Sequence, residues 1–373
     1  MSTSAPIFQA ILLSISLVLV FSRLSIRVSA RLGLIDFPNS APHKQHSRAT
    51  PLAGGLALMA TLLVSEALMG NFHDRSLQAT FLAAGVVFLF GIWDDLKSLP
   101  PLVKLSGQIL ASLVLIVAGV HIRIFESPGF FIQVSGDLKL YLDWLVTVFW
   151  IVGIVNAFNF VDSMDGLTVG LAGMASAFFV LVTLDAQQPL LSLHSALILG
   201  VCLGLYFFNS PPAKLFLGDA GAQTLGLVLA ALAIVYSPPG FNQSSSWFVP
   251  ILLLGVPIFD TTLVVYSRLR RRKPVYSAAR DHTYHRLLSF GLEPLRAVLV
   301  MQGAALFLGC LAFIVLPLSP ALANLVFVAV LVVAALALSF LDRRCYWVER
   351  YHLEPGPSNE RPRERLTPGS LPK

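Results

Sequence analysis

Several aspartates lie in short polar motifs that interrupt long apolar stretches of the chain. Asp94 and Asp95 are adjacent, Asp162 and Asp165 are three residues apart, and Asp219 lies in a Gly-Asp-Ala-Gly motif. Carboxylates that are close together repel one another, and a divalent cation relieves that repulsion. Mg²⁺ prefers oxygen ligands and commonly binds one or two carboxylates together with phosphate oxygens of a substrate. These acids therefore indicate Mg²⁺-assisted chemistry on phosphates, with Mn²⁺ as a substitute metal.

Each motif also has a structural interpretation. An Asp-Asp pair can be the solvated end of a helix, and Asp162 and Asp165 can cap the helix that follows them. The Gly-Asp motif can be a tight turn, although it also resembles the start of a backbone loop that holds an anion. Lys and Arg near the acids suit anionic phosphates. The motifs taken together favour phosphoryl transfer over a set of unrelated structural roles.

The elements that carry these motifs are predicted to be membrane helices. The 373 residues are 56% hydrophobic and only 12% charged, and the mean hydropathy is +0.76. A soluble domain contains about 25% charged residues, so only lipid can solvate this chain. Eleven stretches approach the length of about 20 apolar residues that a membrane helix needs. They lie at 6–22, 52–70, 77–93, 102–120, 141–160, 167–184, 190–208, 220–236, 247–266, 297–317 and 320–341.

The basic residues orient these predicted helices. Of the 26 Lys and Arg, 23 fall in alternate loops and in the tail, and only Arg75, Arg123 and Lys139 fall on the other side. The positive-inside rule places the larger group in the cytoplasm, with the N-terminus outside and the C-terminus inside. The acidic motifs fall on the same side, although they were not used to assign it. The net charge of +6 therefore reports orientation, and no nucleic-acid partner is expected.

The fold expected is an all-α polytopic membrane protein with about eleven transmembrane helices. Residues 1–341 form one integral membrane domain. Residues 342–373 are rich in Pro and charged residues, which predicts a disordered cytoplasmic tail.

The motifs resemble those of the polyprenyl-phosphate N-acetylhexosamine-1-phosphate transferases. The resemblance runs from about Arg31 to Gly291, and the motifs keep the family's order. Departures include Ser163, Ala279 and Tyr284, where many members have Gly, Asp and His. The chain lacks three adjacent histidines, which argues against the phospho-MurNAc-pentapeptide translocase branch. The matching residues are Asp36, Phe37, Pro38, Asn39, His46, Thr50, Pro51, Gly54, Gly55, Asp94, Asp95, Lys104, Gln108, Asn156, Asn159, Asp162, Asp165, Gly166, Leu167, Phe216, Gly218, Asp219, Gly221, Gly226, Pro257, Asp260, Arg280, His282, His285, Arg286 and Gly291.

The resemblance implies a reaction and a location. A UDP-N-acetylhexosamine, first of all UDP-GlcNAc, and a polyprenyl phosphate such as undecaprenyl phosphate would give a polyprenyl-diphospho-sugar and UMP. The product would initiate a cell-surface glycan such as lipopolysaccharide O-antigen, capsule or teichoic acid. The enzyme would lie in a bacterial inner membrane with its site on the cytoplasmic face. A homodimer is compatible with the resemblance.

The resemblance also assigns roles to residues. Asp219 is expected to bind the metal, and Asp162 and Asp165 to position that ion or the substrate phosphates. Asp94, with Asp95 beside it, is expected to deprotonate or to orient the lipid phosphate. Asn159 could hydrogen-bond uracil or the sugar, and Phe216 could stack on uracil. The full set expected to bind substrate is Lys44, His46, Lys104, Asn156, Asn159, Phe216, His282, His285 and Arg286.

Several alternatives remain open at this point. The lipid phosphate can attack the sugar nucleotide directly, or an aspartyl-phosphate can form first. The donor can be another UDP-N-acetyl sugar. An ion-coupled transporter is the rival from another class, although its acids would be expected near the bilayer midplane. A catalytically inactive protein of the same fold is disfavoured because all the central aspartates are present.

Overall fold

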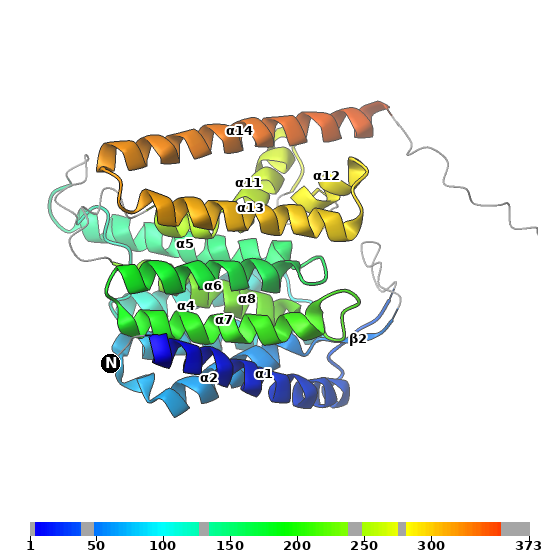
Figure 1. Ribbon diagram of the computed structural model, residues 1–373. Helices are drawn as coiled ribbons and strands as arrows, with labels where there is room; N and C mark the ends of the chain where they lie inside the picture. Colours follow the sequence, from blue (N-terminus) through cyan, green and yellow to red (C-terminus); the bar gives the residue numbers. More distant parts are fainter. Residues whose placement is uncertain (1–3, 39–47, 127–133, 238–247, 275–280, 352–373) are drawn as a thin grey trace, which may run out of the picture.

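The chain forms a bundle of long helices that run side by side (Figure 1). The computed structural model describes residues 4–38, 48–126, 134–237, 248–274 and 281–351. The helices are α1 (Ser4–Leu32), α2 (Gly54–Met69), α3 (Arg75–Lys97), α4 (Pro101–Val117), α5 (Leu138–Val161), α6 (Leu167–Asp185), α7 (Pro189–Asn209), α8 (Gly218–Val235), α10 (Val249–Leu253), α11 (Gly255–Arg270), α12 (Thr283–Ser289), α13 (Pro294–Val315) and α14 (Pro320–Tyr351), with a 3-10 turn at Asn71–His73.

The multi-pass helical architecture predicted from hydropathy is confirmed. Each predicted apolar stretch overlaps one or two of the described helices. In the described part of the chain, eight helices are long and apolar enough to cross a membrane, whereas α2 and α4 are shorter apolar helices of 16 and 17 residues. Large apolar side chains on the outer helices are exposed, as expected for a surface that lipid covers. The chain is therefore a polytopic membrane protein.

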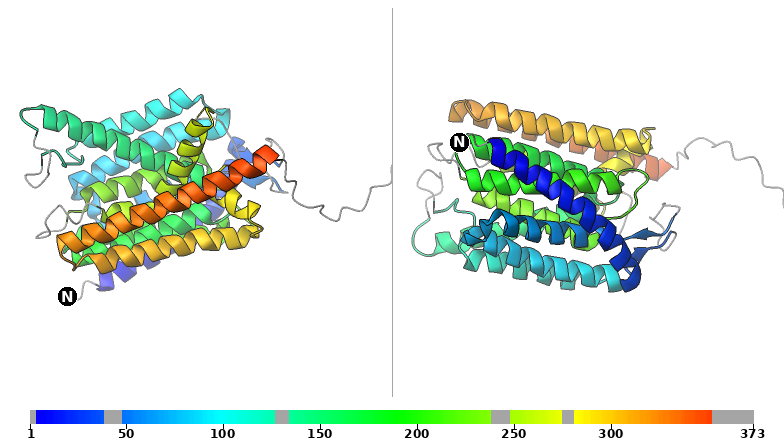
Figure 2. Two further views of the ribbon diagram at one scale, coloured as in Figure 1. Left: turned by 90° about the horizontal axis from the view of Figure 1, so that it is seen from above. Right: turned by 60° about the horizontal axis from the view of Figure 1, so that its bottom comes forward.

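The ninth predicted stretch is broken into α10 and α11. Pro257 lacks a backbone N–H, and its ring crowds the carbonyl group four residues earlier, at Leu253. That carbonyl belongs to the last residue of α10, and Leu254 leaves helical geometry before α11 begins at Gly255. Because of the break, α11 is inclined to its neighbours α13 and α14 (Figures 1 and 2).

Helix α8 is the centre of the bundle. It contacts α2, α3 and α5, and 83% of its most apolar stretch is buried. Small residues allow this close packing. A Cβ atom added to Gly91 of α3 would lie 2.4 Å from Ala220 Cα, and one added to Gly55 of α2 would lie 2.6 Å from Gly221 N. The backbone contacts fix the start of α8, where Asp219 lies, against the ends of α2 and α3.

A two-stranded antiparallel sheet lies beside the helices of this predominantly α-helical fold. Strand β1 (Ile35–Asp36) pairs with β2 (Thr50–Pro51), with Ile35 opposite Pro51. Leu52, directly after β2, forms a parallel bridge with Phe216 in the loop before α8. The strands are too short to produce a recognisable alternation of polar and apolar residues, so hydropathy could not reveal them.

Helix α14 extends past residue 342, where the predicted tail begins. The helix continues through Tyr351, beyond the end of its apolar stretch. Asp342 is buried, with 1% of its surface exposed. The rest of the predicted tail, residues 352–373, lies outside the described residues.

Candidate active site

The predicted acidic residues lie at one end of the bundle, which we call the acidic end. Asp94 and Asp95 are in the last turn of α3, Asp162 directly follows α5, Asp165 precedes α6, and Asp219 is in the first turn of α8. The sheet and α12 lie at this same end, on the right in Figure 1. Motifs spread over the sequence from residue 94 to residue 219 are thus brought together in space.

Lys104 lies between two of the predicted aspartates. Its Nζ contacts Asp94 Oδ2 and is 2.7 Å from Asp219 Oδ2. Pro100 caps α4 and Pro101 is the first residue of the helix. Lys104 therefore lies in the first turn of α4, beside the end of α3. The Asp94 side chain is 4% exposed, whereas those of Asp219 and Lys104 are 28% and 29% exposed. The structure therefore holds a positive charge at an accessible point between two carboxylates.

Asp95 contacts the N-terminus of α8. Its Oδ1 accepts a hydrogen bond from Asp219 N (2.8 Å) and its Oδ2 accepts one from Ala220 N (3.2 Å). Free N–H groups and the helix dipole favour a carboxylate at this place. Gly218 has φ of +71°, and a Cβ atom there would lie 2.7 Å from Asp95 Oδ2. In this structure Asp95 fixes the backbone of Asp219.

Asp162 and Asp165 lie in the loop between α5 and α6. Burial raises the pKa of Asp162 to about 7, and repulsion from Asp95 and Asp165 acts in the same direction. Asp165 Oδ2 accepts a hydrogen bond from Ala213 N at 3.0 Å. Asp162 is therefore a carboxylate whose charge is disfavoured until a cation or another donor compensates it.

Two residues that sequence reasoning missed hold this loop. Asn209 Oδ1 accepts a hydrogen bond from Gly166 N (3.1 Å), and its Nδ2 donates one to Leu215 O. Gln302 of α13 donates from Nε2 to Gly166 O at 3.1 Å. Both are buried amides inside or at the end of apolar stretches, and a polar residue in such a place was the available signal.

Asn156 and Asn159 differ in their surroundings. Asn156 donates from Nδ2 to Gln108 Oε1 (2.7 Å), and Gln108 Nε2 donates to Gln223 Oε1 (3.2 Å), so these amides link α4, α5 and α8. Asn159 Oδ1 is buried and has no hydrogen-bond partner among the described residues. A buried acceptor without a donor is unfavourable, so Asn159 is the better of the two for binding a substrate N–H or O–H group.

Phe216 is fixed by its backbone. Its N–H donates to Pro51 O (2.9 Å) and its carbonyl accepts from Gly54 N (2.9 Å), which joins the α8 loop to strand β2. Lys44 and His46, also predicted to bind substrate, lie outside the described residues.

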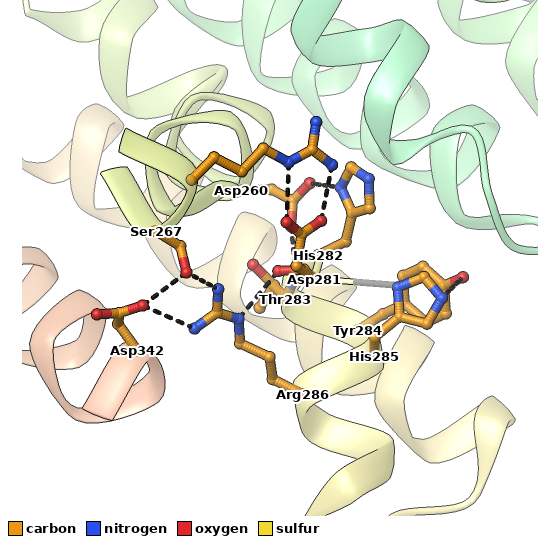
Figure 3. Close-up of polar contacts among 10 residues, drawn as sticks. Asp260, Ser267, Asp281, His282, Thr283, Tyr284, His285, Arg286 and Asp342 are labelled. Atoms are coloured by element: carbon orange, nitrogen blue, oxygen red, sulfur yellow. Dashed lines mark hydrogen bonds and ion pairs between the residues drawn. The ribbon is translucent and has the colours of Figure 1, made fainter. Parts of the chain in front are cut away.

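The histidine-containing segment around α12 is held by buried ion pairs (Figure 3). His282 Nδ1 is 2.9 Å from Asp260 Oδ2, and Asp260 Oδ1 accepts from Thr283 N at 2.6 Å. Asp281 receives two hydrogen bonds of 2.8 Å from Arg268. Burial opposes ionisation of Asp281, but the hydrogen bonds and charge of Arg268 outweigh it and lower the pKa. Asp260 and Asp281 therefore fix the backbone and ring of His282.

The predicted residues of this segment do not share one environment. The His282 ring lies edge-on to Phe160 of α5, with centroids 6.0 Å apart, so it is beside the acidic end. The His285 ring lies 3.9 Å from the Tyr284 ring, tilted by 32°, and its Nε2 is 2.6 Å from the Tyr284 hydroxyl. Arg286 is 1% exposed and donates to Asp281 O and Ser267 Oγ. In this structure the Arg286 guanidinium is buried in the packing of the segment, whereas His282 faces the acidic end.

Several known proteins have sequences similar to this chain. The chain is 30% identical to a probable undecaprenyl-phosphate N-acetylglucosaminyl 1-phosphate transferase of Bacillus subtilis, over 79% of this chain and 81% of the relative. The model of glycosyl transferase family 4 matches residues 77–237. The chain belongs to glycosyl transferase family 4. This family assignment agrees with the resemblance found in the motifs and favours an enzyme over an ion-coupled transporter.

Further relatives carry related names. The chain is 32% identical to a decaprenyl-phosphate N-acetylglucosaminephosphotransferase of Mycobacterium tuberculosis, over 77% of this chain and 76% of the relative. It is 27% identical to an undecaprenyl-phosphate alpha-N-acetylglucosaminyl 1-phosphate transferase of Escherichia coli K12, over 80% of each. The family 4 match covers Asp94, Asp95, Lys104, Asp162, Asp165 and Asp219, and ends before His282.

The acidic end of this family 4 chain has a donor set that suits a divalent cation. No group of three or more His, Cys, Asp or Glu side chains is arranged around a common point in the described part of the chain. Asp94 and Asp219 nevertheless already share one cation, the ammonium group of Lys104. Two carboxylate ligands, with phosphate oxygens completing the coordination, are the arrangement typical of Mg²⁺.

Proposed function

We propose that the chain transfers N-acetylglucosamine 1-phosphate from UDP-GlcNAc to a polyprenyl phosphate and releases UMP. The observation that carries the proposal is the meeting of Asp94, Lys104 and Asp219 at the accessible acidic end. The relatives with names for this activity support the choice of substrates. Undecaprenyl phosphate, the acceptor named for the Bacillus and Escherichia relatives, is the first lipid to test.

Charge neutralisation is the main requirement of this reaction. The lipid phosphate attacks the β-phosphorus of the nucleotide sugar, so two anions must approach each other. Mg²⁺, or Mn²⁺ in its place, would be held by Asp219 with Asp94 and would neutralise the diphosphate. Lys104 provides a further positive charge within reach of the same phosphates. Asn159 accepts a hydrogen bond from the sugar or from uracil, and His282 lies beside the leaving UMP.

Asp94 needs only to orient the acceptor phosphate and does not have to act as a general base. The second pKa of a phosphate monoester is about 6, so the lipid phosphate is largely dianionic at neutral pH without a strong base. Direct attack then needs no covalent intermediate. The competing mechanism, through an aspartyl-phosphate, needs a carboxylate with a free face, and Asp95 is committed to two backbone N–H groups.

The membrane topology belongs to the same proposal. We propose eleven crossings, with α2, α4 and the broken α10–α11 unit counted as crossings, and with the N-terminus outside and the acidic end in the cytoplasm of a bacterial inner membrane. The distribution of Lys and Arg supports this orientation. The product would begin a cell-surface glycan such as an O-antigen, and a homodimer is compatible with this topology.

Purified protein tests the proposal directly. With UDP-GlcNAc, undecaprenyl phosphate and Mg²⁺, we expect release of UMP and formation of a lipid-linked diphospho-sugar, detected by mass spectrometry. Asp219→Ala should abolish both. A parallel series of other UDP-N-acetyl sugars identifies the donor. Absence of UMP release from every donor, in a preparation that remains folded, would refute the transferase assignment.

A further inference from the structure

Asp342 is a buried carboxylate on a helix that is otherwise mostly exposed. In α14 only 11% of the most apolar stretch is buried, and Phe340, two residues before Asp342, is 58% exposed. The Asp342 side chain is 1% exposed. A charge is buried in this way only when nearby groups compensate it. The residue lies well beyond the family match, which ends at residue 237.

The compensating groups come from the end of α11 and from α12, and Figure 3 shows two of them, Ser267 and Arg286. Ser267 Oγ donates a hydrogen bond of 2.6 Å to Asp342 Oδ1, and Arg270 Nη2 is 2.8 Å from Oδ2. Arg271 Nη2 and Arg286 Nη1 are 3.6 and 3.7 Å from Oδ1. Asp342 therefore brings negative charge to a place where three guanidinium groups meet.

A short series of contacts leads from Asp342 to His282. Arg286 Nη2 donates to Ser267 Oγ at 2.9 Å, and Arg286 Nε donates to Asp281 O at 2.9 Å. Asp281 directly precedes His282, and its carboxylate is held by Arg268. The position of the His282 backbone thus depends on where the Arg286 guanidinium is fixed.

We propose that Asp342 is a positioning residue for His282. Its carboxylate anchors Arg286, and Arg286 in turn fixes the Asp281 carbonyl group and so the direction of the His282 ring toward the acidic end. This inference rests on the proposed function, in which His282 acts on the sugar nucleotide. If Asp342 loses its charge, a countercharge of the buried Arg286 is lost, and the segment must shift to rehydrate the guanidinium.

A double-mutant cycle separates positioning from a general effect on stability. Asp342→Asn should lower kcat by on the order of tenfold, as for other residues that orient a reacting side chain, while KM changes less. In a His282→Ala background the same change should have little further effect, because there is no ring left to position. Asp342→Glu should restore part of the rate. Glu293→Gln, which removes an exposed carboxylate at the start of α13, should behave as wild type.

Ser267→Ala provides a milder second variant if Asp342→Asn does not fold. It removes the hydroxyl group that joins Arg286 to Asp342 and leaves both charges in place. We expect a smaller loss of kcat that also disappears in the His282→Ala background. Equal losses in both backgrounds, or wild-type kinetics in both single variants, would overturn the inference.

Chemical modification of His282 tests the placement without the reaction. The His282 side chain is 12% exposed, and Asp342→Asn should increase its rate of modification by diethyl pyrocarbonate, measured by mass spectrometry of the peptide. An unchanged rate would refute the positioning role even in a protein that releases no UMP. Absence of UMP release from wild type, with a raised modification rate in the variant, would refute the proposed function alone.

Discussion

At the scale of single residues, Lys104 and the proposed divalent cation are expected to compete for the same two carboxylates. The ammonium group contacts Asp94 and lies 2.7 Å from Asp219 Oδ2, where a bound metal ion would be expected. Lys104→Met should therefore bind Mn²⁺ more tightly than wild type, measured by electron paramagnetic resonance of the free ion. A gain of roughly tenfold, or about 1.4 kcal/mol, is within the few kcal/mol that a unit charge supplies at this distance near a protein surface.

A matched control is available on the preceding helix. Lys97 is exposed at the end of α3, three residues after Asp94, so Lys97→Met changes the net charge equally. It should leave Mn²⁺ affinity close to the wild-type value. Weaker binding in Lys104→Met would mean that Lys104 assists the metal and does not compete with it. The rate of transfer should fall in Lys104→Met in either case, because the variant lacks the ammonium group that we propose lies beside the diphosphate of the substrate.

The raised pKa of Asp162 predicts that the free energy of unfolding depends on pH. Its pKa is raised from the usual value near 3.8 to about 7 in the folded protein. Between these values the folded state binds more protons than the unfolded state, so the free energy of unfolding decreases as pH rises from about 4 to about 7. Asp162→Asn should remove this contribution and raise the melting temperature at pH 8 by a few degrees relative to wild type.

The comparison is made in detergent, without divalent cations, across that pH range. Wild type and Asp162→Asn should have similar melting temperatures near pH 5 and should separate as pH rises. Parallel pH profiles for the two proteins would contradict the raised pKa. Added Mg²⁺ should reduce the difference at pH 8 if Asp162 faces the metal, because the cation stabilises the charged carboxylate.

At the scale of elements, the packing of α3 on α8 fixes the distance between the two acidic motifs. Gly91→Ala would place a Cβ atom 2.4 Å from Ala220 Cα, so one helix has to move. We expect a loss of about 1–3 kcal/mol of stability, typical of overpacking, together with a loss of transfer activity larger than the loss of folded protein. Both are measured on the same detergent-solubilised sample.

Gly153→Ala is the control for a glycine within a membrane helix. A Cβ atom at Gly153 of α5 has no neighbour within 4 Å, so the change should be neutral or slightly stabilising. Equal activity in the Gly91 and Gly153 variants would show that the α3–α8 contact does not set the geometry of the site.

The helices and strands also show which parts of the fold could be predicted from the sequence. Apolar stretches located the long helices because a bilayer imposes length and hydropathy on each crossing. The break at Leu254, the short β1–β2 pair and the helical continuation to Tyr351 leave no signal in hydropathy, because each depends on local geometry or tertiary contacts.

The contacts of the candidate site residues could likewise be predicted only in part. The motifs indicated Asp94 and Asp219, but they could not show that Asp95 caps α8 or that Arg286 is buried. Those roles depend on which partner each side chain meets.

At the scale of the whole molecule, the prediction concerns which end of the bundle faces the cytoplasm. Ser135, before α5, and Arg272, after α11, are both exposed. The proposed eleven crossings would put them on opposite sides of the membrane. With Cys310 and Cys345 replaced by Ser, Ser135→Cys should react with a membrane-impermeant maleimide in right-side-out vesicles. Arg272→Cys should react only in inside-out vesicles or after the membrane is opened, since 23 of the 26 Lys and Arg are assigned to its side.

The reverse pattern would place the acidic end outside, where neither UDP-GlcNAc nor cytoplasmic Mg²⁺ could reach it. Labelling of both positions from the same side would instead show that the number of crossings between them is even, and the broken α10–α11 unit would be the first element to exclude from the count.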